Sequence, residues 1–152
     1  MTFRLSKRSL QRLEGVKPDL VRVVKRAIEL TKVDFGVVQG LRTPEEQAAN
    51  VAKGASQTMN SKHLTGDAVD LVAYIGPNIS WDEKYYPTIA DAMKAAAIEL
   101  GVPVRWGGAW HVADIRTWEG TMEEAMLDYA RKRRAEGREP FLDLGHFELG
   151  RA

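Results

Sequence analysis

Two side chains that can bind a metal ion or transfer a proton lie seven residues apart in the stretch SKHLTGDAVD, residues 61–70. Asp70 stands inside the apolar run AVDLVAYI, and an ionised carboxylate among apolar side chains is costly unless it is paired or bound to a metal. His63 precedes it in a polar loop, and Gly66 permits the tight bend that would bring the two side chains together. From the spacing alone, a polar sheet face beside a loop histidine explains this pattern equally well.

The C-terminal stretch DLGHFEL supplies a third such group, His146, with Asp143 three residues before it and Glu148 two residues after it. If His146 begins a strand, Glu148 shares its face, whereas Asp143 reaches the same space from the preceding turn. One aspartate and two histidines are a sufficient ligand set for catalytic Zn²⁺, with a fourth position left for water. A carboxylate outside that set could act as the general base, and we choose Asp143 for this role. Glu148 is better explained as a partner of a ligand or as a surface residue.

The composition limits both the metal site and the class of protein. No cysteine occurs among the 152 residues, so any metal ion must be held by histidine and carboxylate side chains. The length predicts one domain with a substantial core. A net charge of +1 does not suggest a dedicated nucleic-acid-binding protein, whose basic excess is normally larger. No apolar signal segment opens the chain and no run approaches the ~18 apolar residues of a membrane span, so we expect synthesis in the cytoplasm.

Helices and strands are both indicated by the pattern of the chain. Apolar spacing and capping residues predict helices at residues 18–30, from Thr43 onward, at about 85–100, and from Thr121 to Gly137. Apolar runs predict strands at residues 35–39, 68–75 and 102–106 and at the C-terminal end. The stretch IGPNISWD, residues 75–82, is interpreted as turn residues. Because the elements lack a strict βαβ rhythm, the sequence favours an α+β fold.

The stretch 61–70 resembles the signature S-x-H-x-x-G-x-A-x-D of the D-Ala-D-Ala metallopeptidases of VanX and VanY type. The matching residues are Ser61, His63, Gly66, Ala68 and Asp70. The second motif of that family, an acidic residue three before a histidine, is matched by Asp143 and His146. The version with GLRT upstream and DLGHFEL at the C-terminus is most similar to phage endolysins that are L-alanyl-D-glutamate peptidases. The two motifs together are specific, whereas each alone would be weak.

This resemblance implies a fold and a metal site. It implies one α+β domain over residues 1–152, with a hedgehog/DD-peptidase-like fold in which a small, mostly antiparallel sheet is packed with helices. It also implies one Zn²⁺ ion held by His63, Asp70 and His146, with Asp143 as the general base.

The resemblance also gives Arg42 and Ser61 possible roles. Arg42 of GLRT corresponds to the family's arginine near the scissile carbonyl, where a guanidinium could stabilise the developing oxyanion. Without the resemblance, a helix-start arginine in a surface ion pair is the better explanation of this residue. Ser61 either contacts the substrate backbone or shapes the loop, and the sequence does not separate these two roles.

Two departures from the family pattern are visible. Related phage enzymes usually read Gly-Gly-Asp-Trp where residues 107–110 read GGAW, so the aspartate is absent or is replaced by His111 or Asp114. Residues 110–140 look longer than in the relatives and are expected to form a helical insertion. No familiar spacing recommends His111 as a metal ligand. Three tryptophans could line a groove but are interpreted as core residues: Trp106, Trp110 and Trp118.

The sequence therefore predicts a zinc-dependent peptidoglycan peptidase, an endolysin that hydrolyses the L-Ala–D-Glu bond of stem peptides for host cell lysis. The alternatives are a D-Ala-D-Ala carboxypeptidase or dipeptidase with the same zinc site, and a non-catalytic zinc-binding domain. We expect a monomer that acts on bacterial peptidoglycan after release across the membrane from the host cytoplasm, with no nucleic-acid partner and no stable membrane insertion. The basic run RKRRAEGR, residues 131–138, is interpreted as a solvated helix face, or as a surface attracted to anionic cell envelopes.

Overall fold

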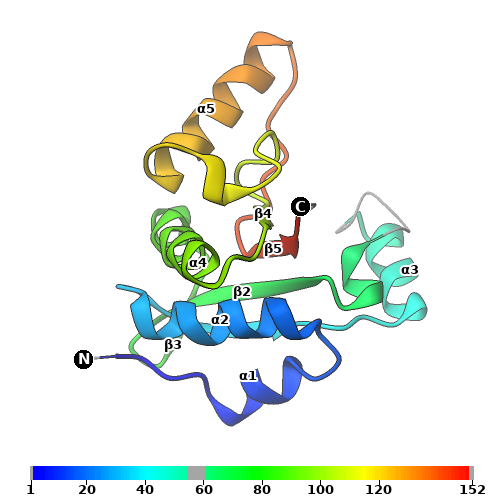
Figure 1. The fold of residues 1–152 in the computed structure, drawn as a ribbon. Coiled ribbons are helices and arrows are strands. Elements are labelled where there is room, and N and C mark those ends of the chain that lie inside the picture. The colour runs from blue at the N-terminus through cyan, green and yellow to red at the C-terminus, as the bar shows by residue number, and fades with distance from the viewer. Residues whose placement is uncertain (1, 55–60, 151–152) are drawn as a thin grey trace.

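The structure is a computed structural model that describes residues 2–54 and 61–150. Its elements form an antiparallel sheet with helices packed around it (Figure 1). The helices are α1 (Lys7–Arg12), α2 (Pro18–Leu30), α3 (Pro44–Ala52), α4 (Tyr86–Leu100) and α5 (Met122–Ala135), with 3₁₀ turns η1 (Lys62–Thr65), η2 (Glu83–Tyr85) and η3 (Ile115–Thr117). The strands are β1 (Asp34–Gln39), β2 (Ala68–Ile75), β3 (Asn78–Ser80), β4 (Val104–Trp106) and β5 (His146–Leu149). The α+β class predicted from the sequence is confirmed.

The long strand β2 lies at the centre of the sheet. The strand order is β1-β2-β5-β4, with β3 paired to the far end of β2, and every pairing is antiparallel. The pairing of β2 with β5 joins segments that are more than seventy residues apart in the sequence, as the pair Asp70 and His146 shows. The middle of the sheet therefore depends on long-range pairing, which brings the two sequence motifs side by side.

The core lies on one face of β2 and against α2 and α4. Val69, Leu71 and Ala73 are fully buried there, whereas Asp70 points to the other face and keeps a quarter of its side-chain exposure. This alternation follows from the two-residue period of a strand. A fully buried valine or leucine stabilises the fold by roughly 1.5–3 kcal/mol relative to an exposed one, so the apolar neighbours fix the direction in which Asp70 points.

Two capping boxes begin helices where the sequence predicted them. At α3 the Thr43 hydroxyl accepts the Glu46 amide at 3.1 Å, and the Glu46 carboxylate accepts the Thr43 amide at 3.1 Å. At α5 Thr121 and Glu124 make the same reciprocal pair at 3.2 and 2.9 Å. Each pair satisfies two amides that have no partner inside the helix.

Three features differ from the sequence prediction. Residues 75–82 are not turn throughout, because β3 returns along β2 after a two-residue loop in which Gly76 has φ +60°. A strand of three residues leaves too short an alternation to be recognised. The helix α1 was not predicted; its first turn is capped by the Ser6 hydroxyl, which accepts the Ser9 amide at 3.1 Å. The strand expected at 102–106 begins at Val104, after a proline that has no amide to donate.

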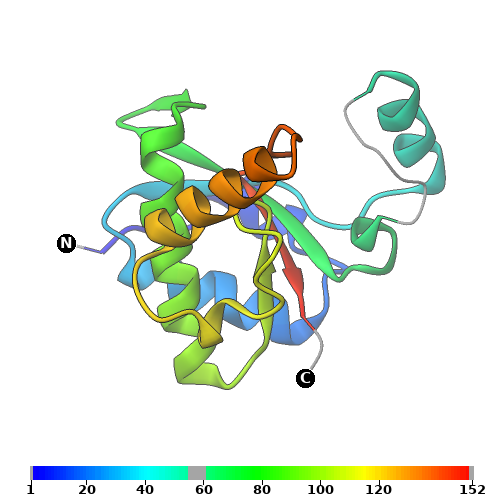
Figure 2. The ribbon, with the colours of Figure 1, turned by 90° about the horizontal axis from the view of Figure 1, so that it is seen from above.

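The helices are spread around the sheet. Figure 1 shows α1 and α5 at opposite ends of the molecule, with α2 and α4 between them, and Figure 2 shows α3 standing to one side of the main body. Among the helices of the described residues, none has the length and apolar character needed to cross a membrane.

Candidate metal centre and active-site cleft

The register of the sheet brings the candidate ligands together. Asp70 of β2 lies opposite Gln39 of β1 on one side and opposite His146 of β5 on the other. The turn η1 directly before β2 carries His63 to the same end of the sheet. Gly66 ends this turn with φ +76°, a conformation that favours glycine, so the tight bend predicted between His63 and Asp70 is confirmed.

His63 is buried and held with one ring nitrogen facing the candidate site. Its Nδ1 lies 2.8 Å from the Gly40 carbonyl oxygen, which can only accept, so Nδ1 carries the hydrogen. The opposite nitrogen, Nε2, then presents a lone pair. It lies 3.2 Å from Asp70 Oδ2 without the alignment of a hydrogen bond, and it has no hydrogen-bond partner among the described residues. A buried ring nitrogen without a partner fits a metal ligand.

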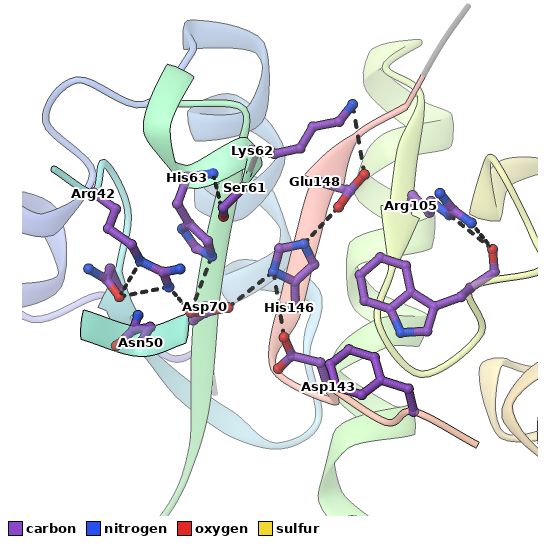
Figure 3. Close-up of a pocket in the computed structure, with 13 residues that line it drawn as sticks. Arg42, Asn50, Ser61, Lys62, His63, Asp70, Arg105, Asp143, His146 and Glu148 are labelled. Atoms are coloured by element: carbon purple, nitrogen blue, oxygen red, sulfur yellow. Dashed lines mark hydrogen bonds and ion pairs between the residues drawn. The ribbon is translucent and has the colours of Figure 1, made fainter. Parts of the chain in front are cut away.

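His146 faces the same point with the other ring nitrogen. Its Nε2 lies 2.8 Å from Glu148 Oε1 on the same strand face, and its Nδ1 lies 3.3 Å from Asp70 Oδ1 (Figure 3). Burial alone would lower the pKa of His146, but the contacts with Asp70 and Glu148 outweigh it and raise the pKa to about 9. Without a metal, the imidazole is therefore held as a cation between two carboxylates.

Together the three side chains form a group that could hold a metal ion. One donor atom from each of His63, Asp70 and His146 lies within 4.8 Å of the other two. Burial would raise the pKa of Asp70, but hydrogen bonding with His146 and the nearby His63 outweighs it and keeps the pKa well below its usual value. Asp70 is thus an anion that faces two imidazoles, as a carboxylate ligand would be.

Asp143 lies at the edge of this group. Its Oδ2 is 3.9 Å from His146 Nδ1, and 47% of its side chain is exposed to solvent. Burial of the carboxyl raises its pKa, and the negative charge of Asp70 raises it further against the opposing effect of His146. The turn that carries Asp143 packs directly on Gly107, where a Cβ atom would lie 2.2 Å from the Asp143 carbonyl oxygen. The first glycine of GGAW, Gly107, therefore allows this close approach.

Arg42 is buried beside Asp70 rather than exposed at the helix start. Its Nη2 lies 3.4 Å from Asp70 Oδ2 (Figure 3). The same Nη2 lies 2.9 Å from Gln39 Oε1, and Nη1 donates to Gln47 Oε1. Its amide donates to the His63 carbonyl at 2.9 Å. The guanidinium is therefore held in one orientation at the cleft, and the surface ion pair considered for Arg42 from the sequence is not what the structure has.

Ser61 shapes the loop that carries His63. Its hydroxyl accepts the His63 amide at 3.2 Å and so caps η1, and the residue also lines the cleft. Of the two roles left open for Ser61, the structural role is observed, and contact with substrate stays a prediction.

The candidate ligands lie in a cleft of about 490 Å³. Several of its residues were not among the predicted site residues: Gln39, Lys62, Arg105, Trp110, Phe141 and Glu148. The sequence does carry one signal for Glu148, because it lies two residues after His146 on a strand and so shares its face. Gln39 and Arg105 carried no comparable signal, since their places depend on strand register.

Residues considered as replacements for the missing aspartate lie outside this cleft. His111 Nε2 pairs with Asp128 at 2.8 Å, and Asp114 pairs with Arg116 at 2.8 Å. Neither belongs to the candidate metal group of the described residues. Trp106 is a core residue as predicted, whereas Trp110 lines the cleft with its ring 5.3 Å from that of His146.

The α+β domain carries two buried histidines and a half-buried aspartate in an open cleft, beside a carboxyl of raised pKa, and these features define a candidate metal-dependent hydrolase. Comparison with known proteins narrows this class. A family model described as phage L-alanyl-D-glutamate peptidase matches residues 1–131. The match includes His63 and Asp70 and ends before Asp143 and His146. This chain belongs to the phage L-alanyl-D-glutamate peptidase family.

Individual relatives agree with the family. The L-alanyl-D-glutamate peptidase of Escherichia phage T5 is 39% identical over 117 residues, which cover 74% of this chain and 85% of the relative. That of Listeria phage A118 is 33% identical over 113 residues, which cover 72% of this chain and 39% of the longer relative. The solved structure of the Serratia marcescens L-Ala D-Glu endopeptidase ChiX has a TM-score of 0.73 and 37% identity, and the alignment covers 97% of this chain and 90% of that one.

Proposed function

We propose that this protein is a zinc-dependent peptidase that hydrolyses the L-Ala–D-Glu bond of peptidoglycan stem peptides. The observation that carries the proposal is the convergence of one donor atom each from His63, Asp70 and His146 within 4.8 Å, in a member of this peptidase family. The free lone pair on His63 Nε2 and the orientation of His146 Nδ1 fit a bound cation. Two imidazoles and one carboxylate, without thiolate, are a donor set that suits Zn²⁺.

Asp143 is the proposed general base. When bound, zinc supplies a Lewis acid that polarises the scissile carbonyl and lowers the pKa of water. Asp143 Oδ2 lies near the ligand group without belonging to it, and its raised pKa brings it closer to the range in which a carboxyl can both accept and donate a proton. We propose that Asp143 takes the proton of the attacking water and returns it to the leaving amine of D-Glu.

Arg42 is the proposed partner of the developing oxyanion. Its guanidinium is fixed by Gln39 and Gln47 before substrate binds, so little reorganisation is needed when negative charge appears on the carbonyl oxygen. Ser61 lines the same cleft and is proposed to contact the substrate backbone.

The proposal also covers where the protein acts, its oligomeric state and its domain organisation. The chain would be made in the host cytoplasm, cross the membrane with help and act on the cell wall to lyse the host. All the residues of the proposed mechanism come from one chain, so a monomer suffices. We propose that residues 1–152 form one peptidase domain and that residues 110–140 are a helical insertion in it.

The test is digestion of purified peptidoglycan with the zinc-loaded protein, followed by mass spectrometry of the soluble products. A released peptide that begins with D-Glu, and its loss after chelation, are the expected results. Release of free D-Ala instead would indicate the carboxypeptidase alternative. Zinc binding without any released peptide would favour a non-catalytic domain.

A further inference from the structure

A second cavity of about 400 Å³ adjoins the cleft on the side away from Arg42. The two cavities share three lining residues, Arg105, Trp110 and Phe141, so the second cavity borders the cleft directly. Figure 3 shows Arg42 and Arg105 on opposite sides of His146. The segment around the C-terminal end of α5 contributes the far wall, with Tyr129, Arg133 and Arg138. We call this second cavity the arginine annex.

Among the residues that the structure describes, the arginines of the annex form no ion pair, in contrast to their neighbours on α5. Within the described residues, no carboxylate forms an ion pair with Arg105, Arg133 or Arg138. The neighbouring cations that do not line the annex are paired: Arg131 and Lys132 with Asp128, and Arg134 with Glu139. Glu136 is the only carboxylate among the described lining residues, so the annex carries a positive excess.

Two of these guanidinium groups are held in place before any ligand binds. Arg105 lies over the Trp110 ring at 5.2 Å and donates to the Trp110 carbonyl. Arg133 lies over the Tyr129 ring at 5.9 Å and donates to the Glu139 carbonyl at 3.1 Å. The aromatic faces and carbonyls orient these cations without forming an ion pair with them. Glu148, which lies opposite Arg105 in the pairing of β4 with β5, acts on Arg105 through its charge, whereas no such carboxylate interaction is found for Arg133 among the described residues. Their remaining donors suit carboxylate, which arginine binds through parallel hydrogen bonds.

We infer that the arginine annex is a substrate subsite that binds the free carboxylates of the stem peptide on the D-Glu side of the scissile bond. This inference rests on the proposed function. Glutamate has two carboxyl groups and can use only one to continue the chain, so the leaving peptide carries at least one free carboxylate. The annex would place those carboxylates beyond His146, away from the Arg42 end of the cleft.

The test compares Arg133→Gln/Arg138→Gln with the matched control Arg131→Gln/Arg134→Gln, which removes the same charge from the same helix end. The substrate is a soluble muramyl tetrapeptide, in free-acid form or with its free carboxyl groups converted to amides. On the acid peptide, the annex variant should show a KM about tenfold higher than wild type with kcat within about twofold, because charged hydrogen bonds contribute to binding substrate and transition state alike. The control should match wild type, and the amide peptide should not distinguish the variants.

Equal KM values for the annex variant and the control on the acid peptide would overturn the inference. So would an equal loss on the acid and amide peptides, or an effect confined to intact cell walls, which would assign the arginines to general attraction toward wall polymers. The single variant Arg138→Gln, at an exposed position, keeps the test valid if the double variant unfolds.

Calorimetric binding of a product peptide that begins with D-Glu separates this inference from the proposed function. If the wild-type protein cleaves neither peptide and yet binds the product peptide more tightly than the annex variant does, the annex is supported and the peptidase activity is rejected. If the wild-type protein cleaves the acid peptide but the annex variant and the control bind the product peptide equally, the peptidase activity is supported and the annex is rejected.

Discussion

The two candidate histidine ligands face the proposed metal position with different ring nitrogens, Nε2 of His63 and Nδ1 of His146. The difference follows from the hydrogen-bond partner of the other nitrogen in each ring. Gly40 accepts a hydrogen bond from Nδ1 of His63, which leaves Nε2 free. Glu148 contacts Nε2 of His146, which leaves Nδ1 facing Asp70. A second contact of this kind fixes the tautomer and the ring plane of a metal-bound histidine. The partner of His63 is a backbone carbonyl, which substitution does not remove. The partner of His146 is the Glu148 side chain, so its contribution can be tested by mutation.

Removal of Glu148 should weaken zinc binding. In Glu148→Ala, the buried Nε2 of His146 loses its partner, and we expect zinc affinity to fall about 10–100-fold. Glu148→Gln keeps an oxygen acceptor and should lose less. Competition with a chelating indicator measures the dissociation constants, and Glu29→Ala on the exposed face of α2 is the control. An unchanged affinity in Glu148→Ala would mean that the contact does not orient the ligand.

Asp143 should be required for turnover and not for metal binding. In Asp143→Asn the side chain cannot accept a proton, and we expect kcat to fall by about 10²–10⁴-fold, the usual contribution of a positioned general base. Zinc content, measured by plasma emission after dialysis, should stay at the wild-type level. Glu139→Gln changes a carboxylate with 88% side-chain exposure in the same segment and should be active. A variant Asp143→Asn with wild-type kcat would remove this residue from the mechanism.

At the scale of elements, the site is made by strand register and by loops that the motifs themselves encode. Gly66 and the alternation around Asp70 are local features, so the sequence alone predicted the bend and the direction of the carboxylate. The pairing of Gln39 and His146 with Asp70 is a long-range property of the sheet. No periodicity in the sequence specifies which residue of one strand faces which residue of the next. Gln39 and Arg105 were therefore missed although they line the cleft.

The two capping boxes provide a matched pair of tests. Thr43→Ala and Thr121→Ala each remove a helix cap, and each should lower the free energy of unfolding by about 1 kcal/mol. Only Thr43→Ala should also lower kcat. The box of α3 includes Glu46, which accepts from Gln39 at 3.1 Å, and Gln39 in turn holds Arg42.

Urea unfolding and initial-rate measurements on both variants check this prediction. Equal kcat values for the two variants would show that the start of α3 does not position Arg42. Lower kcat values in both would point to a general effect of lost stability.

At the scale of the whole molecule, the candidate site concentrates buried charge around the space proposed for a cation. Asp70, His146 and Glu148 form a line of alternating charge in the metal-free protein, with Arg42 at one end and Lys62 at the other. The sequence could identify the histidines and Asp70 because their spacing matches a known pattern. It could not show that Lys62 and Glu148 continue the line, because the 3.8 Å contact between them joins η1 to β5.

This arrangement predicts opposite pH trends for stability with and without metal. The pKa of His146 is about 9 in the folded metal-free protein, against a reference near ~6.5 for an unfolded chain. A group with a raised folded pKa stabilises the protein fully below its unfolded pKa, and this stabilisation is lost as the pH rises through the folded value. The melting temperature of the metal-free protein should therefore fall between about pH 6.5 and pH 9. Zinc must displace the proton from Nδ1, so its affinity should rise over the same range.

The difference in melting temperature between the zinc-loaded and the chelator-treated protein should consequently widen from pH 6.5 to pH 9, because a ligand stabilises in proportion to the logarithm of its concentration over its dissociation constant. Calorimetry in zinc-buffered solutions at three pH values measures both curves. In His146→Gln the titrating group is gone, so the fall in the metal-free curve should be much reduced. A metal-free wild-type protein whose melting temperature holds steady or increases across this range would show that the imidazolium is not held between Asp70 and Glu148.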